Sequence, residues 1–511
     1  MPSREYTART RTDFVTKVFG IDTRALAAFR IGLGSILLVD LGNRAADLVA
    51  HYSDAGVLPL SALDALAPGI QLSFHAWSGA VEWQAFLFVL AGAFATALLV
   101  GYRTRCVTVL SWGFMLSLHH RNPFVINSGD SIFLVLLLWG CLLPLGMRWS
   151  LDARRMRRAP RDQTVFSVAT AGVLLQLYAV YLLSIVYKTG ATWREDFTAV
   201  YYALQLDAYT TALGQALGDA PLLVLQAATV MTLVVEFAGP LLALSPFRSG
   251  AARTVAAFAL IGFHVGLATT MTLGIFPFVC MAAWLLVLPA PFWDLLGRWA
   301  SRAIPSIQGR TIEGWRPHGT GPPAAEPTAL VSVVACALLV MSVLVSWRAL
   351  DPLGTGFTFG RSVLVVDRPA SALLLKGRWG MFAPDPSVDD VWYETVGLTA
   401  EGEQVDLADG RPYRPVRADE ASSRYRTQRW RKLLFEHFGR DPFSPHRGHY
   451  AAFLWSDWHR QFPNRPLQSI EVATQTEPSP AWGEAAQIDR LVLVRYRPRR
   501  ARLQASRTWG T

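Results

Sequence analysis

The chain has 511 residues, of which 52% are hydrophobic and 17% charged, and its formal net charge is +10. Globular domains carry about 25% charged residues, so this composition excludes an ordinary soluble protein and indicates a membrane protein. The positive charge does not call for nucleic acid as a partner, because membrane proteins concentrate Lys and Arg in their cytoplasmic loops.

About nine stretches are long and apolar enough to cross a membrane, for which a helix needs about 20 residues. In chain order they cover residues 25–46, 82–101, 105–119, 130–147, 165–187, 221–244, 253–271, 273–292 and 328–347. The third stretch is short, and the seventh and eighth are closely joined. The pattern predicts a mainly α fold, a polytopic transmembrane helical bundle of about nine spans.

Basic residues occupy alternate connections between these stretches. Besides the basic N-terminus they are Arg103 and Arg105; Arg148, Arg154, Arg155, Arg157, Arg158 and Arg161; Arg248 and Arg253; and Arg298, Arg302, Arg310 and Arg316. Because cytoplasmic loops are rich in Lys and Arg, we expect a multi-pass protein of the cell membrane with a cytoplasmic N-terminus. An odd number of spans then places the C-terminal domain outside the cytoplasm.

Composition divides the chain into four parts. Residues 1–300 hold eight of the predicted spans, 301–327 form a basic, Pro/Gly-rich cytoplasmic linker, 328–347 form the ninth span, and 350–500 form a small external α+β domain. In that domain we expect strands at 392–398, 404–407, 469–475 and 488–497 and amphipathic helices at 422–438 and 448–462. The basic tail that follows either contacts anionic lipid headgroups or is simply solvated.

Charged residues inside the predicted spans are candidates for function. The first span carries Arg30, Asp40 and Arg44, of which the last two have the i,i+4 spacing of a pair on one helix face. The alternative is that Arg44 already lies outside the bilayer. Glu236 lies deep in the sixth span, and such a residue is either part of a functional site or a carboxyl that joins helices, protonated or paired with an arginine such as Arg30.

Lys188 stands out by both composition and position. The chain has only four lysines, Lys17, Lys188, Lys376 and Lys432, and Lys188 directly follows the apolar run 165–187. A desolvated lysine can lose its proton, whereas an arginine cannot, so Lys188 is a candidate base. The alternative is an interfacial lysine whose side chain extends to the lipid headgroups.

Three histidines complete the candidate set. His119 and His120 close the third predicted span, and His264 lies within the seventh, where it is either functional or a hydrogen-bonded packing residue. A neutral lysine flanked by histidine and aromatic side chains is suited to take a proton from a lipid-soluble acid such as a quinol. No metal is expected, because no further ligands follow at matched spacing, and motifs of soluble enzymes are missing from the sequence.

Several segments resemble a known family. They are IDTRALAAFRIGLGSILLVDL with YSDAGVLP (52–59), LHHRNPFVINSGDSIFLVLLLWGCLLPLG (118–146), YLLSIVYKTGATW (181–193), the pair 263–264 followed by Gly274 and Phe276, and KGRWGMFAPDP (376–386). Together they resemble the family of vitamin K-dependent gamma-carboxylase and the bacterial horizontally transferred transmembrane (HTTM) proteins. In the carboxylase a lysine likewise stands five residues before a tryptophan, the spacing of Lys188 and Trp193 here.

The resemblance implies roles for individual residues. Lys188 matches the base that deprotonates reduced vitamin K, and His120, or His119, matches a catalytic histidine of an outer loop. His264 matches a further family histidine, and we group it with Glu236, Trp193 and Arg30 as substrate-binding. Fewer residues follow the last span than in the carboxylase, so quinol oxygenation is a more natural expectation than carboxylation of a tethered protein.

Two hypotheses of function follow. The first is a carboxylase-like enzyme, a lyase relative, that uses reduced vitamin K or menaquinol with Lys188 as the base. The second is a non-catalytic membrane protein whose bundle holds lipid or quinone and whose outer domain docks an extracytoplasmic protein. A transporter is disfavoured, since the sequence shows neither an inverted repeat nor paired broken helices.

Overall fold

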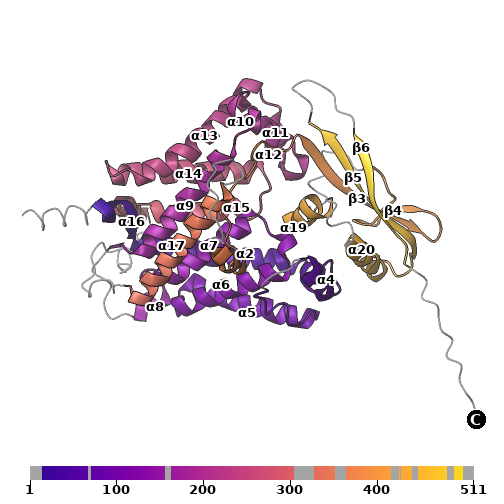
Figure 1. Ribbon diagram of the computed structural model, residues 1–511, viewed down its shortest axis with the longest axis horizontal. Helices are drawn as coiled ribbons and strands as arrows, with labels where there is room; N and C mark the ends of the chain where they lie inside the picture. The colour runs from indigo at the N-terminus through magenta and orange to yellow at the C-terminus, as the bar shows by residue number, and fades with distance from the viewer. Residues whose placement is uncertain are drawn as a thin grey trace, which may run out of the picture.

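The computed structural model describes residues 14–66, 71–155, 163–303, 327–350, 364–415, 425, 427–439, 447–479 and 488–498. It shows a helical bundle with a small β-sheet at one end (Figure 1). The prediction of a mainly helical chain with a mixed C-terminal part is therefore confirmed. Most of the predicted linker 301–327, residues 304–326, lies outside the described residues.

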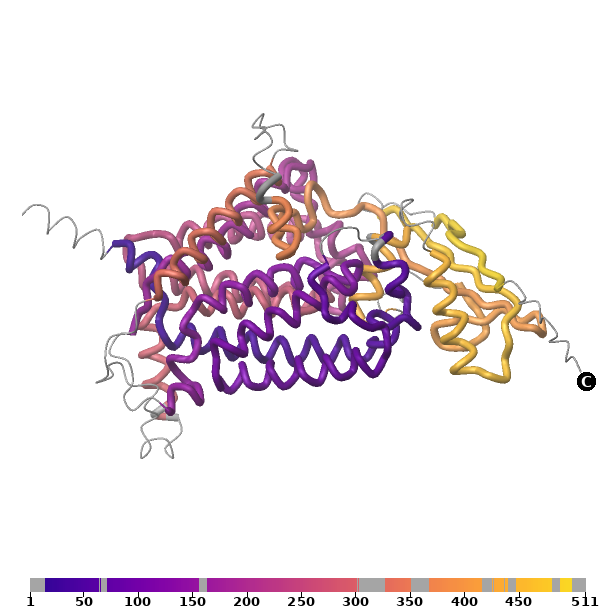
Figure 2. Tube along the Cα trace, turned by 60° about the horizontal axis from the view of Figure 1, so that its bottom comes forward, coloured from indigo at the N-terminus to yellow at the C-terminus, as the bar shows by residue number. Residues whose placement is uncertain are grey.

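A helix occupies the place of each predicted span. These helices are α2 (Thr23–Ala45), α5 (Val81–Val100), α6 (Thr104–Arg121), α7 (Ser128–Leu142), α9 (Val168–Tyr187), α13 (Leu222–Leu244), α14 (Ser249–Thr270), α15 (Phe276–Trp284) and α17 (Ala329–Ala349). Helices α2, α5 and α6 run side by side in Figure 2. The apolar stretches seen in the sequence are thus the helices of the bundle.

Fewer of these helices are long and apolar enough to cross a membrane alone. Among the described residues six qualify, namely α2, α5, α9, α13, α14 and α17. A seventh span arises only if Phe276–Val287 and Ala290–Ala300 count as one, although they meet at an angle of 101°. Nine separate spans are therefore not confirmed.

The physical reasons for the difference are local. Helix α7 has 15 residues, fewer than the roughly 20 that a full crossing needs. The predicted span 273–292 breaks at Pro289, where the missing N–H and the restricted residue before proline end the first helix. Helix α6 is 18 residues long but begins and ends with basic residues, Arg105 near its start and Arg121 at its end.

Short elements connect the bundle helices. They are α3 (Leu48–Tyr52), α4 (Leu60–Leu66), η1 (Pro123–Val125), α8 (Leu151–Arg155), α10 (Ala191–Arg194), α11 (Ala199–Gln205), η2 (Asp207–Tyr209), α12 (Ala212–Gly218), η3 (Leu285–Val287), α16 (Ala290–Ala303) and α18 (Leu364–Ala372). A two-stranded antiparallel ladder of β1 (Ile21–Asp22) and β2 (Thr164–Val165) ties the start of α2 to the segment before α9.

The C-terminal domain is an antiparallel sheet in the order β4-β3-β5-β6. Its strands are β3 (Asp389–Thr399), β4 (Gln404–Asp406), β5 (Leu467–Pro478) and β6 (Asp489–Tyr496), and its helices are α19 (Gln428–Lys432), which continues as the π-helical η9 (Leu433–Phe438), and α20 (Arg447–Gln461). All four predicted strands are present, and the predicted hairpin pairs β3 with β4. Helix α20 packs on β5 and β6 through a buried face that includes Tyr450 and Trp458.

The two ends of the bundle differ in what they carry. Helices α8 and α16, which belong to basic connections, lie at the end away from the sheet in Figure 1. The C-terminal domain lies against the other end, where α19 faces the bundle in Figures 1 and 2. The turn after α9, with Lys188, is on the same side as the C-terminal domain, because cavity walls described below contain residues of both.

Candidate functional site: a cavity between the bundle and the C-terminal domain

A cavity of about 760 Å³ lies where the helical bundle meets the C-terminal domain. Its walls come from α9, α13 and α14, from the segments around α11 and η2, from residues 380–391, and from α19. Most of the bundle side chains that line it are apolar, among them Val200, Leu204, Phe263 and Leu267. Its volume lies within the range of about 300–1,000 Å³ that is usual for small-molecule sites.

Lys188 and Glu236 form an ion pair in the wall of this cavity. The ammonium of Lys188, the residue that caps the C-terminus of α9, donates a hydrogen bond to Oε2 of Glu236 on α13. The two residues are only 3% and 5% exposed, so Lys188 does not extend to the surface as an interfacial lysine would. The partner of Glu236 is thus Lys188 and not Arg30.

The indole of Trp193 covers the same ammonium group. Nζ of Lys188 lies 4.5 Å from the centroid of the Trp193 ring, a cation–π geometry that stabilises the protonated amine. Burial lowers the pKa of Lys188 below its ordinary value, and the Glu236 carboxylate acts in the opposite direction. The predicted spacing of the lysine and the tryptophan therefore corresponds to a direct contact.

A chain of hydrogen bonds extends the polar part of the site into the bundle. Nε2 of His264 on α14 lies 2.7 Å from the hydroxyl of Tyr181, which also accepts a 2.9 Å hydrogen bond from the indole N–H of Trp284. His264 and Tyr181 both line the cavity. Nδ1 of His264 is buried without a hydrogen-bond partner in the described part of the chain, so this nitrogen remains available to a ligand.

The segment 376–386 closes one wall against the turn that carries Lys188. The indole N–H of Trp193 donates to the carbonyl of Phe382 at 2.7 Å, and the N–H of Gly190 donates to the carbonyl of Pro384 at 3.1 Å. A Cβ on Gly190 would lie 1.7 Å from the carboxylate of Asp385, so only glycine permits this approach. Two motifs that are far apart in the sequence thus form one structure.

Helix α19 supplies the opposite wall. Nδ2 of Asn127 donates to Oε1 of Gln428 at 2.6 Å, and the same Gln428 side chain packs on Gly274, whose φ of +64° favours glycine. Arg431 donates to the hydroxyl of Thr272 at 2.8 Å. The cavity is therefore closed by contacts between the C-terminal domain and the loops of the bundle.

A buried ion cluster holds α19 on the bundle next to the cavity. Nε of Arg44 donates to Asp40 at 2.7 Å, and its Nη2 donates to Asp130 at 2.7 Å. Arg429 of α19 donates to Asp40 at 2.6 Å and to Asp130 at 2.9 Å. All four side chains are at most 2% exposed, so Arg44 is inside the protein and its predicted i,i+4 pair with Asp40 is present.

The remaining predicted residues lie apart from the cavity. His119 belongs to the ion cluster, where its Nε2 lies 3.3 Å from Nη2 of Arg44. His120 donates from Nε2 to the carbonyl of Ala372 at 2.9 Å. Neither histidine is among the described residues that line the cavity, although both are buried.

Arg30 lies in a separate environment. Its guanidinium donates to three backbone carbonyls at 2.5–2.9 Å, those of Leu98, Leu99 and Trp149. These groups belong to the end of α5 and to the connection before α8. Arg30 thus joins the C-terminal end of α5 to the connection before α8 and is not among the described residues of the cavity wall.

Sequence reasoning did not identify Arg429, Asp130, Gln428 or Arg431. Asp130 carried a usable signal, because Asn127 and Asp130 have the spacing of a capping box and the structure shows both of its hydrogen bonds. No group of three or more His, Cys, Asp or Glu side chains in the described ranges is arranged to hold a metal ion.

Comparisons with known proteins agree with the architecture of the bundle. The family model described as the HTTM domain matches residues 20–293, which is more than half of the chain. Comparisons with curated proteins and with solved structures gave no significant match. The matched segment contains α2 to α15, and therefore Lys188, Glu236 and His264. With its several apolar helices, the chain is an integral, multi-pass membrane protein and belongs to the HTTM family.

Proposed function

We propose that the cavity binds a membrane-soluble molecule with an acidic proton and that the Lys188–Glu236 pair accepts this proton. The observation that carries the proposal is the buried pair itself, which stands in the wall of an apolar cavity where α9 ends. A charge pair is costly to bury, and such pairs with perturbed protonation are typical of functional sites.

A quinol is the substrate that fits this chemistry best. The ring of reduced menaquinone or vitamin K is apolar and aromatic, as are many of the side chains that line the cavity. The hydroxyl of the quinol is acidic enough to give its proton to an amine or carboxylate base. The resemblance of the segment 181–193 to the carboxylase supports the same choice of substrate. His264 also lines the cavity, and its Nδ1, which has no hydrogen-bond partner among the described residues, would bond a quinol oxygen.

The proton balance of the step is simple. In its neutral state the pair shares one proton between Nζ of Lys188 and the carboxylate of Glu236. For Lys188 to act as the base, that shared proton lies on the Glu236 carboxyl before the step, and Nζ is a neutral amine. The quinol O–H breaks and its proton joins Nζ, so that the pair then holds an ammonium and a carboxylic acid. The ammonium next to the quinol anion stabilises the charge that develops. Dissolved oxygen would serve as the oxidant, since a quinol and one O₂ together give an epoxide and one water.

The proposed topology places this chemistry at the outer face of the cell membrane. We infer a cytoplasmic N-terminus and an extracytoplasmic C-terminal domain, with α6, α7 and the bent pair also lying within the bilayer as parts of about nine crossings. The basic connections at the end of the bundle away from the sheet support this orientation. A reporter fused to the C-terminus tests it, and a cytoplasmic signal would contradict it.

The test of the reaction uses purified protein, reduced menaquinone and oxygen. We expect the wild type to form epoxide or quinone and Lys188→Ala and Glu236→Gln to slow the reaction by about 10²–10⁴-fold. Lys188→Arg should be equally slow, because arginine keeps its proton. Lys17→Ala is the matched control, as this lysine lies outside the cavity. If the wild type forms no more product than Lys188→Ala, the enzymatic proposal fails.

A second candidate function is binding without catalysis. The many apolar side chains in the cavity wall favour it, because they suit a lipid or quinone tail as well as a substrate ring. In that case a lipid should copurify with the wild type and remain bound in Lys188→Ala. The outer domain would then bind an extracytoplasmic protein. A pull-down from intact cells, in which this domain is exposed at the cell surface, would detect such a partner.

A further inference from the structure

The cavity beside Lys188 contains two buried polar atoms that have no hydrogen-bond partner among the described residues. One is Nδ1 of His264, and the other is Oγ of Ser184, which lies in the last turn of α9. Both residues line the cavity, and each is only 1% exposed. Buried polar groups in proteins are almost always hydrogen-bonded, because leaving one without a partner costs free energy. Two such atoms in the wall of one cavity therefore point to a ligand that bonds them.

The hydroxyl of Ser184 differs from those of neighbouring helices. A serine or threonine within a helix can donate to the carbonyl four residues earlier, which satisfies its O–H. Thr232 on α13 and Thr270 on α14 line the same cavity, and both make this bond, at 2.9 Å and 2.8 Å. Within the described chain Ser184 has no bond of this kind, so its hydroxyl can both donate and accept. The wall therefore contains a hydroxyl that the described part of the protein does not itself use.

Ser184 lies between Lys188 and the pair of Tyr181 and His264. Tyr181, Ser184 and Lys188 have the spacing i, i+3, i+7 of one helix face, and all three line the cavity. At a rise of about 1.5 Å per residue, Ser184 is about 6 Å from Lys188 and about 4.5 Å from Tyr181 along the helix axis. Nε2 of His264 lies 2.7 Å from the Tyr181 hydroxyl. From the end of α9 inward, the wall thus carries the ion pair of Lys188, the Ser184 hydroxyl and the His264 imidazole.

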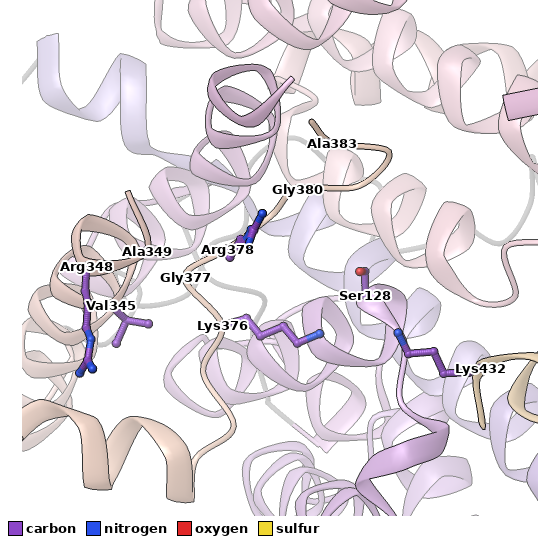
Figure 3. A pocket seen from close by; sticks show the side chains of 10 residues that line it. All are labelled: Ser128, Val345, Arg348, Ala349, Lys376, Gly377, Arg378, Gly380, Ala383 and Lys432. Atoms are coloured by element: carbon purple, nitrogen blue, oxygen red, sulfur yellow. The ribbon is translucent and has the colours of Figure 1, made fainter. Parts of the chain in front are cut away.

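A neighbouring cavity of about 730 Å³ adjoins the first, and the two share four wall residues, Ser128, Gly380, Ala383 and Lys432. The neighbouring cavity is lined by the end of α17, the segment 376–383, the start of α7 and the end of α19 (Figure 3). Ser184 and His264 are not among the described residues of its wall. The two unpartnered atoms therefore belong to the part of the larger cavity that the bundle helices α9 and α14 form.

We propose that Ser184 is a specificity-determining residue, which selects ligands with a second oxygen at the far end of the ring from the oxygen that meets Lys188. The inference rests on the proposed function and narrows its substrate to aromatic diols with hydroxyls at opposite ends of one ring. The separation of two such oxygens is close to one helical turn of about 5.4 Å, and Ser184 is one turn inward from Lys188.

The second oxygen of the ligand would give both unpartnered atoms a hydrogen bond. The O–H of Ser184 donates to this oxygen. In the tautomer whose Nε2 donates to Tyr181, Nδ1 of His264 accepts a hydrogen bond from the second hydroxyl. A ring with a single hydroxyl would leave both atoms without a partner, and a site with polar groups of this kind discriminates against the ligand that lacks the matching group.

The experiment measures the binding of two small probes to the full chain in nanodiscs under nitrogen. Naphthohydroquinone has hydroxyls at opposite ends of one ring, and α-naphthol is the same ring system with one hydroxyl. Calorimetry, with binding to empty nanodiscs subtracted, gives the affinity of each. We expect the wild type to bind naphthohydroquinone about 10–100-fold more tightly, because its second oxygen gains two hydrogen bonds. Ser184→Ala should reduce this preference about tenfold without weakening the binding of α-naphthol.

Ser111→Ala on α6 is the matched control. The hydroxyl of Ser111 is also buried without a partner in the described part of the protein, but Ser111 is not among the described residues of the cavity wall. This variant should keep the preference of the wild type. In the absence of ligand, Ser184→Ala should unfold no more easily than the wild type, since it loses no hydrogen bond among the described residues. A lowered unfolding midpoint would assign the hydroxyl a structural role and overturn the inference.

The inference is also overturned if the wild type binds both probes equally or neither of them, or if Ser111→Ala loses as much of the preference as Ser184→Ala. Its failure is distinguishable from that of the proposed function, because no oxidation takes place in this assay. A wild type that shows the preference but never oxidises the diol in air contradicts proton transfer to Lys188 and supports the inference. Oxidation that proceeds while Ser184→Ala keeps the full preference contradicts the inference alone.

Discussion

Removal of the Arg429 side chain is the most direct test of how the C-terminal domain is attached. In the wild type the cluster of Asp40, Arg44, Asp130 and Arg429 contains two carboxylates and two guanidinium groups, all buried. Arg429→Gln leaves two carboxylates with one guanidinium. Breaking a buried pair from one side costs about 3–5 kcal/mol, because one charge stays buried without compensation.

The structure also predicts how this loss is repaired. Asp40→Asn, introduced together with Arg429→Gln, leaves the 2.7 Å pair of Arg44 and Asp130 and a cluster without net charge. We expect the double variant to be more stable than Arg429→Gln alone, with a coupling free energy of about 1–3 kcal/mol in a double-mutant cycle. The sign of this coupling separates charge compensation from simple loss of packing.

The assay is equilibrium unfolding in detergent, together with limited proteolysis to detect undocking of the domain. Arg460→Gln is the matched control, since this arginine pairs with Asp457 at 2.7 Å on the surface of the same domain. It should cost less than about 1 kcal/mol. Arg429→Gln with a cost as small as that of the control, or a double variant less stable than either single one, would refute the reasoning.

Three further changes probe other parts of the structure. Gly190→Ala places a Cβ 1.7 Å from the Asp385 carboxylate and should cost about 1–3 kcal/mol in thermal unfolding, whereas Gly250→Ala, with nothing within 4 Å, should be neutral. Burial raises the pKa of Asp390 from 3.8 to about 7. Between about pH 4 and pH 7 the folded protein therefore binds more protons than the unfolded chain, so its free energy of unfolding should fall as pH rises through this range. Asp390→Asn should remove this pH dependence and be more stable than the wild type at pH 8 by a few kcal/mol. Tyr181→Phe removes the hydroxyl that is hydrogen-bonded to both Trp284 and His264, and it should lower the free energy of unfolding by about 2 kcal/mol in denaturant. An unchanged unfolding midpoint would show that these hydrogen bonds do not stabilise the bundle.

The helices of the bundle could be predicted from the sequence because apolar length alone marks them. The limit of this approach shows at 273–292, where hydropathy continues across Pro289 although the backbone turns by 101°. The proline was visible in the sequence and indicates the break. The hairpin of β3 and β4 was predictable for a similar local reason, since a Glu-Gly turn separates its two strands.

The site was predictable only as separate residues. Lys188, Glu236 and His264 each stood out as a polar group in an apolar run, but helical periodicity does not say which helices are neighbours. That Glu236 pairs with Lys188, and not with Arg30, is a consequence of how α9 packs on α13. The two histidines at the end of α6 were singled out by their place in the sequence, and packing directs them away from the cavity.

The contribution of α19 was beyond sequence reasoning. Its residues QRWRK form an ordinary basic amphipathic pattern, which usually indicates a solvated surface. Only the tertiary structure shows that Arg429 is buried against two carboxylates of α2 and α7. The one hint was Asp130, the single charged residue in the sequence of α7, because a buried charge requires a partner from elsewhere in the fold.

The contact between the turn 188–193 and the segment 376–386 joins the family segment to residues that lie beyond its end. The family segment ends at residue 293, yet the carbonyl that receives the Trp193 indole N–H belongs to Phe382, and Gln428 and Arg431 form another wall of the same cavity. A fragment cut at residue 293 would keep Lys188 and Glu236 but lose the cover over them. Water would then have access to the pair from that side. In this chain, the cover of the cavity therefore comes from outside the segment that the family model matches.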